Sequence, residues 1–440
     1  GEKTLNATND RDETGTIMSD TKTNGPVLAA DGTPLKKSLA RALRVEKTRA
    51  LMLIAPLLIF VLISFIIPIV SMLFRSVDNR IVDETMPYTV AALKNWDASQ
   101  GELPDEAVYA ALARDMKAAA AEKSHTRIGG RLNYEESGFS SLFRKTGRVA
   151  KKFDLENGGP FKEVLIDTHK DWGKVETWKT MQTHSVKFTN GYFLNAVDMK
   201  RTPDGAQVQD EDKRVLLKLF GRTMWMSLVI TSLCVLLGYP VAWILANLPA
   251  RQANLLMILV LLPFWTSLLV RTSAWKVMLQ QQGVINDVLV WLGFLADDDR
   301  LIIINNATGT IIAMTHILLP FMILPMYSVM QTIQPTYLRA AKSLGATNWT
   351  AFWRVYFPQS IPGIGAGSIL VFILAIGYYI TPEIVGGNKG VFISNRIAYH
   401  ISTSLNWGLA AALGSILLGA VLILYWAYDK IVGIDNVKLG

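Results

Sequence analysis

Long apolar runs with at most one charged residue alternate with polar connections along this chain, and the pattern predicts six membrane-spanning helices. Each run is about 20 residues or longer, which is the length at which a helix crosses the hydrocarbon core of a bilayer. A shorter apolar run, Val284–Phe294, is too short to span and is predicted to lie in the membrane interface. The six predicted spans are Ala50–Phe74, Thr223–Pro249, Ala253–Ala274, Gly309–Met330, Ile361–Thr381 and Leu409–Tyr428.

Proline and glycine interrupt several of these runs. Pro56 and Pro68 lie in the first run, Gly238–Pro240 is a predicted kink in the second, and Pro320 and Pro325 lie in the fourth. Such residues break backbone hydrogen bonds, which is tolerated in a membrane where helices line a cavity. The pattern therefore favours a transport pathway over a static membrane anchor.

Residues 76–216, between the first two spans, are polar, with nearly balanced acids and bases. About 140 residues can bury a core, so we expect a folded insertion, all-α or α+β, rather than a linker. Leu103–Lys123 is predicted as a helix, because Pro104 and two acids precede an alanine-rich body. Gly138–Lys152 is predicted as a second amphipathic piece, and stretches such as Val186–Phe193 are predicted as strands.

No catalytic constellation is visible in the insertion. His125, His169 and His184 lack the spacing of metal ligands, and we interpret them as exposed or hydrogen-bonded side chains. The single cysteine, Cys234, lies in an apolar run, so no disulfide within the chain is expected.

Composition supports the membrane assignment, since 50% of the 440 residues are hydrophobic and only 18% are charged. The net charge of +8 is compatible with nucleic acid, but the basic residues are spread over the tail and loops without a nucleic-acid-binding motif. No nucleic-acid partner is therefore expected. Residues 1–48 are predicted to form a disordered cytoplasmic tail that ends in a basic cluster before the first span, at residues 49–75.

Six spans and the basic cluster place both termini in the cytoplasm, including a short tail at residues 433–440. The same topology places residues 335–358 inside and the insertion 76–216 outside. One group conflicts with it, because four basic residues lie at the outer end of the second span. Long loops translocate largely regardless of charge, so the topology is retained. The four residues are Lys213, Arg214, Lys218 and Arg222.

The connection 335–358 is basic and aromatic, and its turn residues predict two short helices separated by a glycine turn. Pro335 suits a first helical turn, Gly345 suits the left-handed residue that ends a helix, and Thr347 or Asn348 can cap the next helix. Pro358 is expected to prevent the second helix from running undisturbed into the fifth span. One face of that helix is predicted to carry Trp349, Phe352, Trp353 and Tyr356.

This spacing resembles the Glu-Ala-Ala loop of permease subunits in binding-protein-dependent ABC importers. Ala340, Ala341, Gly345 and Pro358 match that pattern, whereas Arg339 departs from it, because the family usually has glutamate there. In the family this loop docks on the ATPase subunit. The resemblance therefore implies that the ATPase-coupling residues are Arg339, Ala340, Ala341, Lys342, Gly345, Ala346, Thr347, Trp349, Phe352 and Pro358.

The resemblance extends over roughly the last half of the chain. Leu261–Trp275, Gly283–Leu295 and Tyr378–Gly387 look like the first permease subunit of spermidine/putrescine-type importers. It implies an all-α polytopic protein of the bacterial inner membrane with the six-helix type I importer permease fold, five of the helices lying in residues 217–432. The short loop typical of that family does not match the insertion, whose role is therefore unassigned.

The partners that the resemblance implies are a second permease subunit in a heterodimer, two ATP-binding subunits, a periplasmic solute-binding protein and membrane lipid. The phosphate-binding pattern GxxxxGK[ST] does not occur in this chain. We therefore expect ATP and Mg to bind the partner ATPase subunits, and we expect this chain to bind no cofactor and to be no enzyme itself.

Two ionisable residues near the membrane boundary are candidate pathway residues, because a charge at membrane depth is costly and is by default a functional hypothesis. Glu383 lies about 22 residues after Ile361, which is about 33 Å along a helix, so Glu383 and Arg271 are both predicted at the outer mouth. The alternative is a structural role in which the two charges snorkel or pair. The predicted substrate pathway comprises Trp265, Arg271, Tyr378, Tyr379 and Glu383.

Two other function classes fit less well. A secondary transporter or channel has no need of an ATPase-docking loop, and a membrane-anchored scaffold or sensor needs only one or two spans. Among importers, Glu383 with neighbouring aromatic side chains favours a cationic amine such as spermidine or putrescine. An opine, an amino-acid-like solute or an anion stays open, because Arg271 repels a cation.

Overall fold

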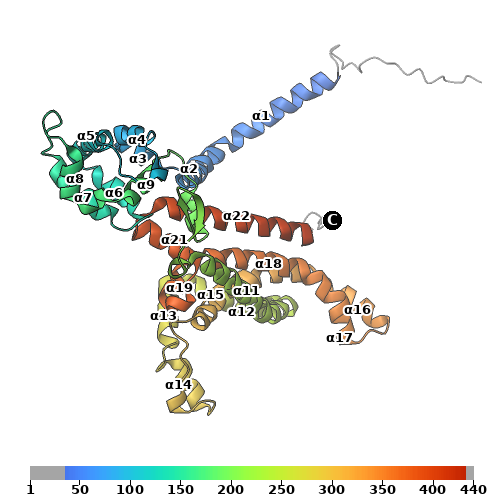
Figure 1. The fold of residues 1–440 in the computed structure, drawn as a ribbon. Coiled ribbons are helices and arrows are strands. Elements are labelled where there is room, and N and C mark those ends of the chain that lie inside the picture. The colour runs from blue at the N-terminus through green and yellow to red at the C-terminus, as the bar shows by residue number, and fades with distance from the viewer. Residues whose placement is uncertain (1–34, 433–440) are drawn as a thin grey trace, which may run out of the picture. The chain divides into compact units, whose positions relative to one another are not determined.

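The computed structural model describes residues 35–432, so most of the predicted tail 1–48 and all of the tail 433–440 lie outside the described residues. The chain divides into two compact units, residues 1–69 and residues 70–440. In the first unit, α1 (Leu35–Val61) runs into a π-helical turn, η1 (Leu62–Ile66), and α2 (Ile67–Arg75) then continues the chain into the second unit (Figure 1). The wider turn directly precedes Pro68, whose ring clashes with the carbonyl four residues earlier.

Within the described residues, five helices are long and apolar enough to span a membrane, and one bent helix pair brings the number to six. Each predicted span therefore has a counterpart. The five unbroken segments are Leu43–Arg75, Glu211–Asn247, Ala307–Thr332, Asn348–Gly377 and Trp407–Lys430.

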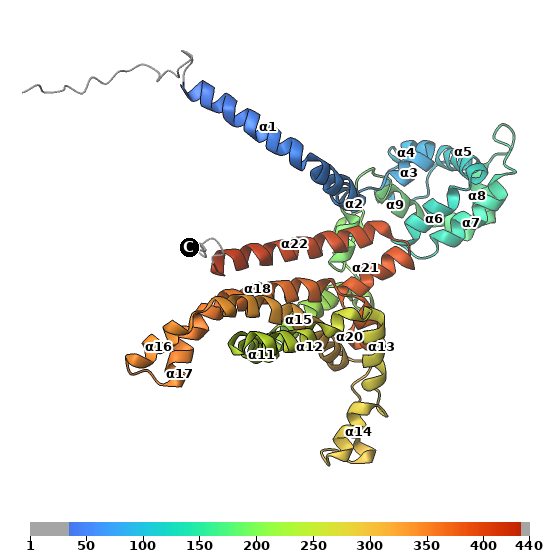
Figure 2. The same ribbon diagram turned by 180° about the vertical axis from the view of Figure 1, so that it is seen from behind.

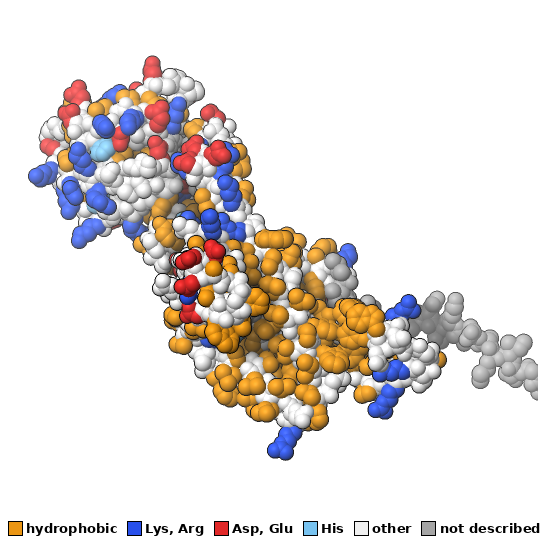
Figure 3. Space-filling model, turned by 90° about the horizontal axis from the view of Figure 1, so that it is seen from below, with side chains coloured by type: hydrophobic (Ala, Val, Ile, Leu, Met, Phe, Trp, Pro, Cys, Tyr) orange, Lys and Arg blue, Asp and Glu red, His pale blue; other side chains and the backbone are white. Residues whose placement is uncertain are grey.

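Three of these helices form the packed centre of the spanning region. They are α11 (Leu216–Asn247), α15 (Ala307–Thr332) and α18 (Phe357–Gly377), which lie side by side in Figure 1 and in Figure 2. Helix α11 continues through Gly238–Pro240, the predicted kink position, without ending there. The last span is α22 (Trp407–Val432). Apolar side chains cover the spanning helices in Figure 3, whereas charged side chains gather over the insertion.

Glycine sets the distance between α15 and α18. A Cβ at Gly363 would lie 3.0 Å from the Cα of Met326, and a Cβ at Gly367 would lie 2.7 Å from the Sδ of Met322. The two backbones therefore approach closely only because these positions lack side chains, which is the way membrane helices gain van der Waals contact.

The third span differs from its prediction as one continuous helix, Ala253–Ala274. Helix α12 (Ala250–Leu261) and the 3-10 turn η5 (Leu262–Trp265) are followed, after a bend of 94°, by α13 (Leu268–Met278). Pro263 lies in the turn, and the Ser267 Oγ accepts a hydrogen bond from the Val270 N–H at 3.2 Å, which caps α13. The short helix α14 (Val284–Trp291) follows, and then the 3-10 turn η6 (Asp297–Asp299).

The fifth span also ends earlier than predicted. Helix α18 stops at Gly377, and Tyr378 has an extended backbone. Three short helices then precede α22, namely α19 (Ile380–Val385), α20 (Gly387–Gly390) and α21 (Ile393–Ser402). Glu383 therefore lies on a separate helix, and the estimate of its depth along a single helix is wrong.

The insertion is folded and mainly helical, with one small antiparallel hairpin. The predicted helices are confirmed as α5 (Glu106–Glu122) and α7 (Phe139–Ala150). The remaining helices are α3 (Arg80–Thr85), α4 (Pro87–Leu93), α6 (His125–Asn133), α8 (Phe161–Thr168), α9 (Val175–Thr183) and α10 (Gly191–Ala196). Short 3-10 turns are η2 (Ala98–Gln100), η3 (Lys170–Gly173) and η4 (Glu211–Lys213).

The predicted strand Val186–Phe193 does not form, and only Phe188 pairs, in an isolated antiparallel bridge with Asp78. The hairpin instead comprises β1 (Met199–Thr202) and β2 (Gly205–Val208), with Met199 opposite Val208 and Thr202 opposite Gly205. The side-chain amide of Asn79 donates to the carbonyls of His184 and Val186 at 2.7 and 2.8 Å. These hydrogen bonds hold the segment after α9 in an irregular path, and Gly191 then begins α10.

A buried aromatic cluster holds the insertion together. The Trp172 Nε1–H donates to the Thr146 Oγ1 at 2.9 Å, while the carbonyl of Trp172 accepts from the Tyr109 hydroxyl at 2.7 Å and from the Trp178 Nε1–H at 3.0 Å. All three aromatic side chains are fully buried. Their polar atoms are therefore satisfied inside the core, so burial carries no unpaired-group penalty.

Candidate functional site

The connection between α15 and α18 folds as its turn residues predict. Helix α16 (Pro335–Ser343) ends before Gly345, which has a φ of +89°, and α17 (Asn348–Ala351) follows. The Thr347 Oγ1 accepts from the Thr350 N–H at 3.2 Å, so Thr347 rather than Asn348 caps this helix. We refer to residues 335–358 as the α16–α17 loop.

Pro358 does not end the second helix. A π-helical turn, η7 (Phe352–Tyr356), joins α17 directly to α18, and Pro358 lies in the first turn of α18. The proline lacks an N–H, and the wider turn before it relieves the clash of its ring with the preceding turn. The α16–α17 loop is therefore continuous with the fifth span, and a displacement of the loop moves the end of that span.

Part of the predicted aromatic face is an anchor for the loop. The Phe352 and Tyr356 rings stack with centroids 5.8 Å apart, and Tyr356 is buried. Tyr239 of α11 contacts Phe352 and Phe357 edge-on or tilted, with centroids 6.2 and 5.8 Å apart. These contacts fix the base of the loop against α11.

The tip of the loop points its apolar groups outward. Trp349 is 72% exposed and Leu344 is 90% exposed, while the Trp349 and Trp353 rings contact each other at 5.6 Å. Exposed side chains of Arg339 and Lys342 lie on the preceding helix α16, and no ion pair among the described residues includes them. Leu344 is missing from the predicted coupling residues, although an apolar residue directly before the turn glycine is a readable signal.

The predicted pathway residues do not form one cluster. Trp265 lies in η5 and is 77% exposed, whereas Arg271 lies in α13 with its Nε and Nη1 buried and without hydrogen-bond partners among the described residues. Glu383 on α19 accepts a 2.6 Å hydrogen bond from the Asn395 Nδ2. No ion pair among the described residues joins Arg271 to Glu383, so the pairing considered above does not form.

Backbone contacts hold Tyr378 and Tyr379 beside Glu383. The carbonyl of Tyr378 accepts from the Ser394 Oγ at 2.6 Å, and the carbonyl of Tyr379 accepts from the Asn395 Nδ2 at 2.8 Å. Asn395 therefore holds in place both the extended segment that follows the end of α18 and the carboxylate of Glu383. Thr272 and Thr381 join α13 to α19 through their hydroxyls, 3.2 Å apart.

Glu383 lines a cavity of about 500 Å³ between the start of α11 and α21. Of the predicted pathway residues, Glu383 alone lines it. Its other charged walls are Lys218, Arg222 and Arg396, and Arg222 donates to the carbonyl of Asn388 at 3.0 Å. In the sequence, Lys218 and Arg222 stand out only because they conflict with the topology. Arg396 has no sequence signal, and only the fold brings it from α21 to the same cavity.

The three histidines of the insertion occupy different environments. The Nδ1 of His125 lies 3.3 Å from the carbonyl of Ala119, and the Nδ1 of His169 accepts from the N–H of Asp171 at 3.3 Å. His184 is buried, with its Nδ1 3.8 Å from Glu135. Within residues 35–432 no group of three His, Cys, Asp or Glu side chains has an arrangement suited to a metal ion.

Comparison with known proteins identifies the spanning region. The family model described as "Binding-protein-dependent transport system inner membrane component" matches residues 238–432. The chain is 36% identical over 209 residues to the "Spermidine/putrescine transport system permease protein PotB" of Escherichia coli (strain K12), covering 47% of this chain and 75% of that protein. The PotB protein of Haemophilus influenzae is 37% identical over 220 residues, covering 48% and 76%.

The chain is a member of this permease family. A solved bacterial alginate ABC transporter is also similar, at 18% identity and a TM-score of 0.43, covering 53% of this chain and 82% of that one. The permease is thus a multi-pass inner-membrane subunit of an ABC importer, with the type I importer fold. The family match begins at residue 238, inside α11, so the insertion lies outside it.

Proposed function

We propose that this permease forms the translocation pathway for a polyamine, such as spermidine or putrescine, or for a related amine that a periplasmic binding protein delivers. The observation that carries the proposal is the identity of 36–37% to permeases named for spermidine and putrescine, over about three quarters of their length. A transmembrane subunit of this kind supplies the path, and ATP and Mg bind the partner ATPase subunits.

The assembly comprises this chain, a second permease subunit in a heterodimer, two ATP-binding subunits and the solute-binding protein, in membrane lipid. Both termini and the α16–α17 loop face the cytoplasm, and the insertion faces the periplasm. The basic residues at the loop support this orientation, because short cytoplasmic loops carry an excess of lysine and arginine.

The α16–α17 loop is the contact through which ATP hydrolysis drives transport. Its tip exposes Leu344 and Trp349, while its base is fixed to α11 through Phe352 and Tyr356. Exposed large apolar side chains on a rigid base are what a docking contact requires, since they gain free energy when a partner covers them. Because α17 continues into α18, force on the tip reaches the fifth span as movement of one helix.

Glu383 is the carboxylate that meets an ammonium group of the solute. It lines the cavity at the start of α11 and is held by Asn395, with Tyr379 half exposed nearby. An ammonium that leaves water needs a carboxylate or an aromatic face to offset its desolvation.

A second candidate is an anionic or zwitterionic solute. Lys218, Arg222 and Arg396 surround Glu383 in the same cavity, and three positive charges against one carboxylate favour an anion. Arg271, with two buried nitrogen atoms lacking hydrogen-bond partners among the described residues, adds to that preference.

The test is uptake of labelled spermidine by the complete importer in proteoliposomes, with putrescine, glutamate and sulfate as competitors. Glu383→Gln is expected to lower spermidine uptake at least tenfold, whereas Asp298→Asn, which neutralises an exposed carboxylate elsewhere, leaves it unchanged. We expect putrescine to compete with spermidine for uptake by the wild-type importer. If only glutamate or sulfate competes, or if Glu383→Gln transports spermidine normally, the amine assignment is wrong and the second candidate replaces it.

A further inference from the structure

A second cavity lies where the insertion meets the last two helices of the permease. Its volume is about 730 Å³. The walls come from the ends of α6 and α9, from β1, and from α21 and the start of α22, with charged or polar side chains that include Glu136, His184, Lys200, Arg201, Arg396 and His400. Most of these walls precede residue 238, where the family match begins. We call it the junction cavity.

The two sides of the junction cavity are tightly joined. The Tyr192 ring of α10 lies directly over Gly408 of α22, where any Cβ would overlap it. The Tyr134 hydroxyl donates to the carbonyl of Ser404 at 2.9 Å, and Tyr192 shares a buried apolar cluster with Leu409 and Leu413. A change in how the insertion sits on α22 would therefore change the shape of the cavity.

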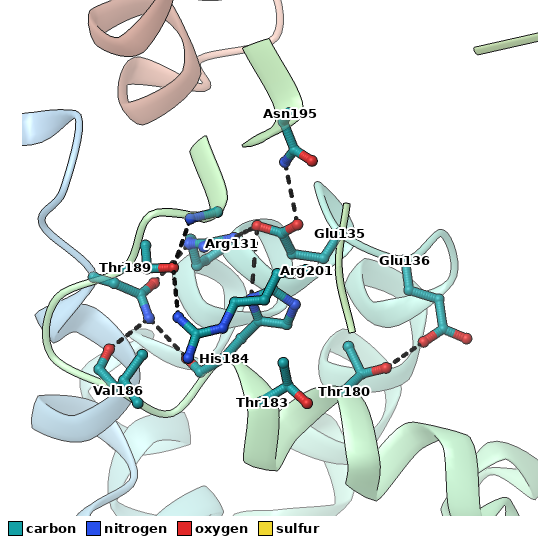
Figure 4. Close-up of polar contacts among 12 residues, drawn as sticks. Arg131, Glu135, Glu136, Thr180, Thr183, His184, Val186, Thr189, Asn195 and Arg201 are labelled. Atoms are coloured by element: carbon teal, nitrogen blue, oxygen red, sulfur yellow. Dashed lines mark hydrogen bonds and ion pairs between the residues drawn. The ribbon is translucent and has the colours of Figure 1, made fainter. Parts of the chain in front are cut away.

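A buried polar network, which includes the lining residues Glu135 and Asn195, lies beside the cavity (Figure 4). Arg131 and Glu135 are paired at 2.7 Å, and both side chains are only 5% exposed. Glu135 also accepts from the Asn195 Nδ2 at 3.2 Å, and Arg131 donates to the Asn79 Oδ1 at 2.8 Å. Because these groups satisfy one another, the Glu135 carboxylate does not give the cavity a free negative charge.

His184, a residue of the cavity wall, has a buried ring nitrogen without a hydrogen-bond partner among the described residues. Its side chain is 3% exposed, and its Nδ1 has no hydrogen-bond partner among the described residues, with Glu135 at 3.8 Å. Burial lowers the pKa of His184 to about 4, so the ring is neutral at neutral pH. The neutral ring therefore adds no charge to the cavity, and leaving its nitrogen unpaired costs free energy.

The charges that remain after pairing are mostly positive. Asp210 pairs with Lys213 at 3.2 Å, and Glu136 accepts from the Thr180 hydroxyl at 2.7 Å. Lys200, Arg201 and Arg396 take part in no ion pair among the described residues. The Arg201 guanidinium donates a long hydrogen bond, of 3.4 Å, to the Thr189 hydroxyl.

We propose that the junction cavity binds a small anion through carboxylate or phosphate oxygens, with Lys200 and Arg201 of the insertion and Arg396 of α21 as its charged contacts. Guanidinium groups match such oxygens with two parallel hydrogen bonds. A bound anion links β1 to α21 across the junction, so it stabilises the docking of the insertion on the last span. Arg396 also borders the Glu383 cavity, but Lys200 and Arg201 line the junction cavity only, so they separate this ligand from the transported solute.

The test uses the complete importer in nanodiscs of neutral phosphatidylcholine. Succinate and inorganic phosphate are titrated at constant ionic strength against chloride, while the thermal unfolding midpoint is followed. A ligand that binds only the folded state raises the midpoint with concentration. We expect a concentration-dependent rise with succinate or phosphate. Nanodiscs containing phosphatidylglycerol show whether a lipid headgroup supplies the anion. If it does, phosphatidylglycerol itself raises the midpoint, and added succinate or phosphate raises it no further.

Matched variants make the test specific. Arg201→Gln and Lys200→Gln are each expected to weaken the anion affinity at least tenfold, and Arg144→Gln, an exposed arginine on α7, leaves it unchanged. If Arg201→Gln lowers the unfolding midpoint even without anion, that substitution destabilises the fold itself. The test of anion binding then uses Lys200→Gln alone. The proposal is overturned if neither succinate, phosphate nor phosphatidylglycerol shifts the midpoint, or if the shift is the same in Lys200→Gln and Arg144→Gln.

Discussion

The insertion and the α16–α17 loop place their large side chains in opposite ways. In the insertion, Trp172 and Trp178 are fully buried and hydrogen-bonded, so the aromatic groups stabilise the fold. In the loop, Leu344 and Trp349 are exposed, and the fold depends on local caps and a glycine turn. Apolar side chains that do not stabilise their own element are available for a partner, which supports the contact role proposed for the loop.

The largest effect expected is the loss of the insertion core. Trp172→Ala removes an indole from the centre of the aromatic cluster and takes away the N–H that donates to the Thr146 hydroxyl. We expect a decrease of about 3–5 kcal/mol in the free energy of unfolding of the insertion. Limited proteolysis of the complete importer in urea measures it. Trp349→Ala is the matched change in the loop and is expected to alter stability by no more than about 0.5 kcal/mol. Equal losses of stability in Trp172→Ala and Trp349→Ala would show that the two regions do not differ in this way.

Acid should weaken the insertion through His184. Burial lowers its folded pKa to about 4, against an ordinary value of 6.5, with Glu135 and Arg131 of α6 and Arg201 of β1 facing it. Between those values the unfolded chain binds a proton that the folded chain does not, so the free energy of unfolding falls as the pH drops from 6.5 towards 4. The loss is of the order of 3 kcal/mol.

Glu135 adds to this loss only at lower pH. Burial alone would raise its pKa, but the charges of Arg131 and His184 and the hydrogen bonds from Arg131 and Asn195 together outweigh burial and hold the pKa below its usual value of 4.5. Its contribution to stability is therefore present above pH 4.5 and is lost as the pH falls further. Unfolding measured from pH 7 to 4.5 should show a slope in the wild type and little slope in His184→Gln. A slope that survives in His184→Gln would contradict the assignment.

A smaller effect is expected at the loop glycine. Gly345 has a positive φ and open space around it, so Gly345→Ala meets no clash and costs only about 1–2 kcal/mol of backbone strain, confined to the turn. Transport and the ATPase activity stimulated by the binding protein should both fall, because the tip is displaced. Gly130→Ala in α6, where the space is also open, is the control and should stabilise its helix by about 0.5–1 kcal/mol. Unchanged coupling in Gly345→Ala would show that the turn has no role.

Local chemistry explains which parts of the fold could be read from the sequence. Gly345, Thr347 and the apolar runs act within a few residues of themselves, so the loop and the spans were predictable. The bend at Pro263–Ser267 was not, because the apolar run continues through it and its length alone favours one helix. Val186–Phe193 has strand-like residues, but the Asn79 amide, over 100 residues earlier in the chain, holds part of it irregular.

The candidate sites divide in the same way. The predicted coupling residues lie within one short stretch of sequence, so their spacing could be read from it. The Glu383 cavity takes Lys218 and Arg222 from α11 and Arg396 from α21, and the junction cavity adds Lys200 and Arg201 from β1. Sequence separation hides such groups, and only tertiary packing brings them to one place.

Thiol cross-linking in the complete importer shows whether the α16–α17 loop or the insertion meets the ATPase. The only native cysteine, Cys234, is buried, so an introduced cysteine at an exposed position reacts selectively. With Trp349→Cys we predict a cross-link to the ATP-binding subunit whose yield changes on addition of ATP, and with Arg144→Cys on α7 we predict none. A cross-link to the ATP-binding subunit from position 144, together with none from position 349, would show that the insertion and not the loop meets the ATPase.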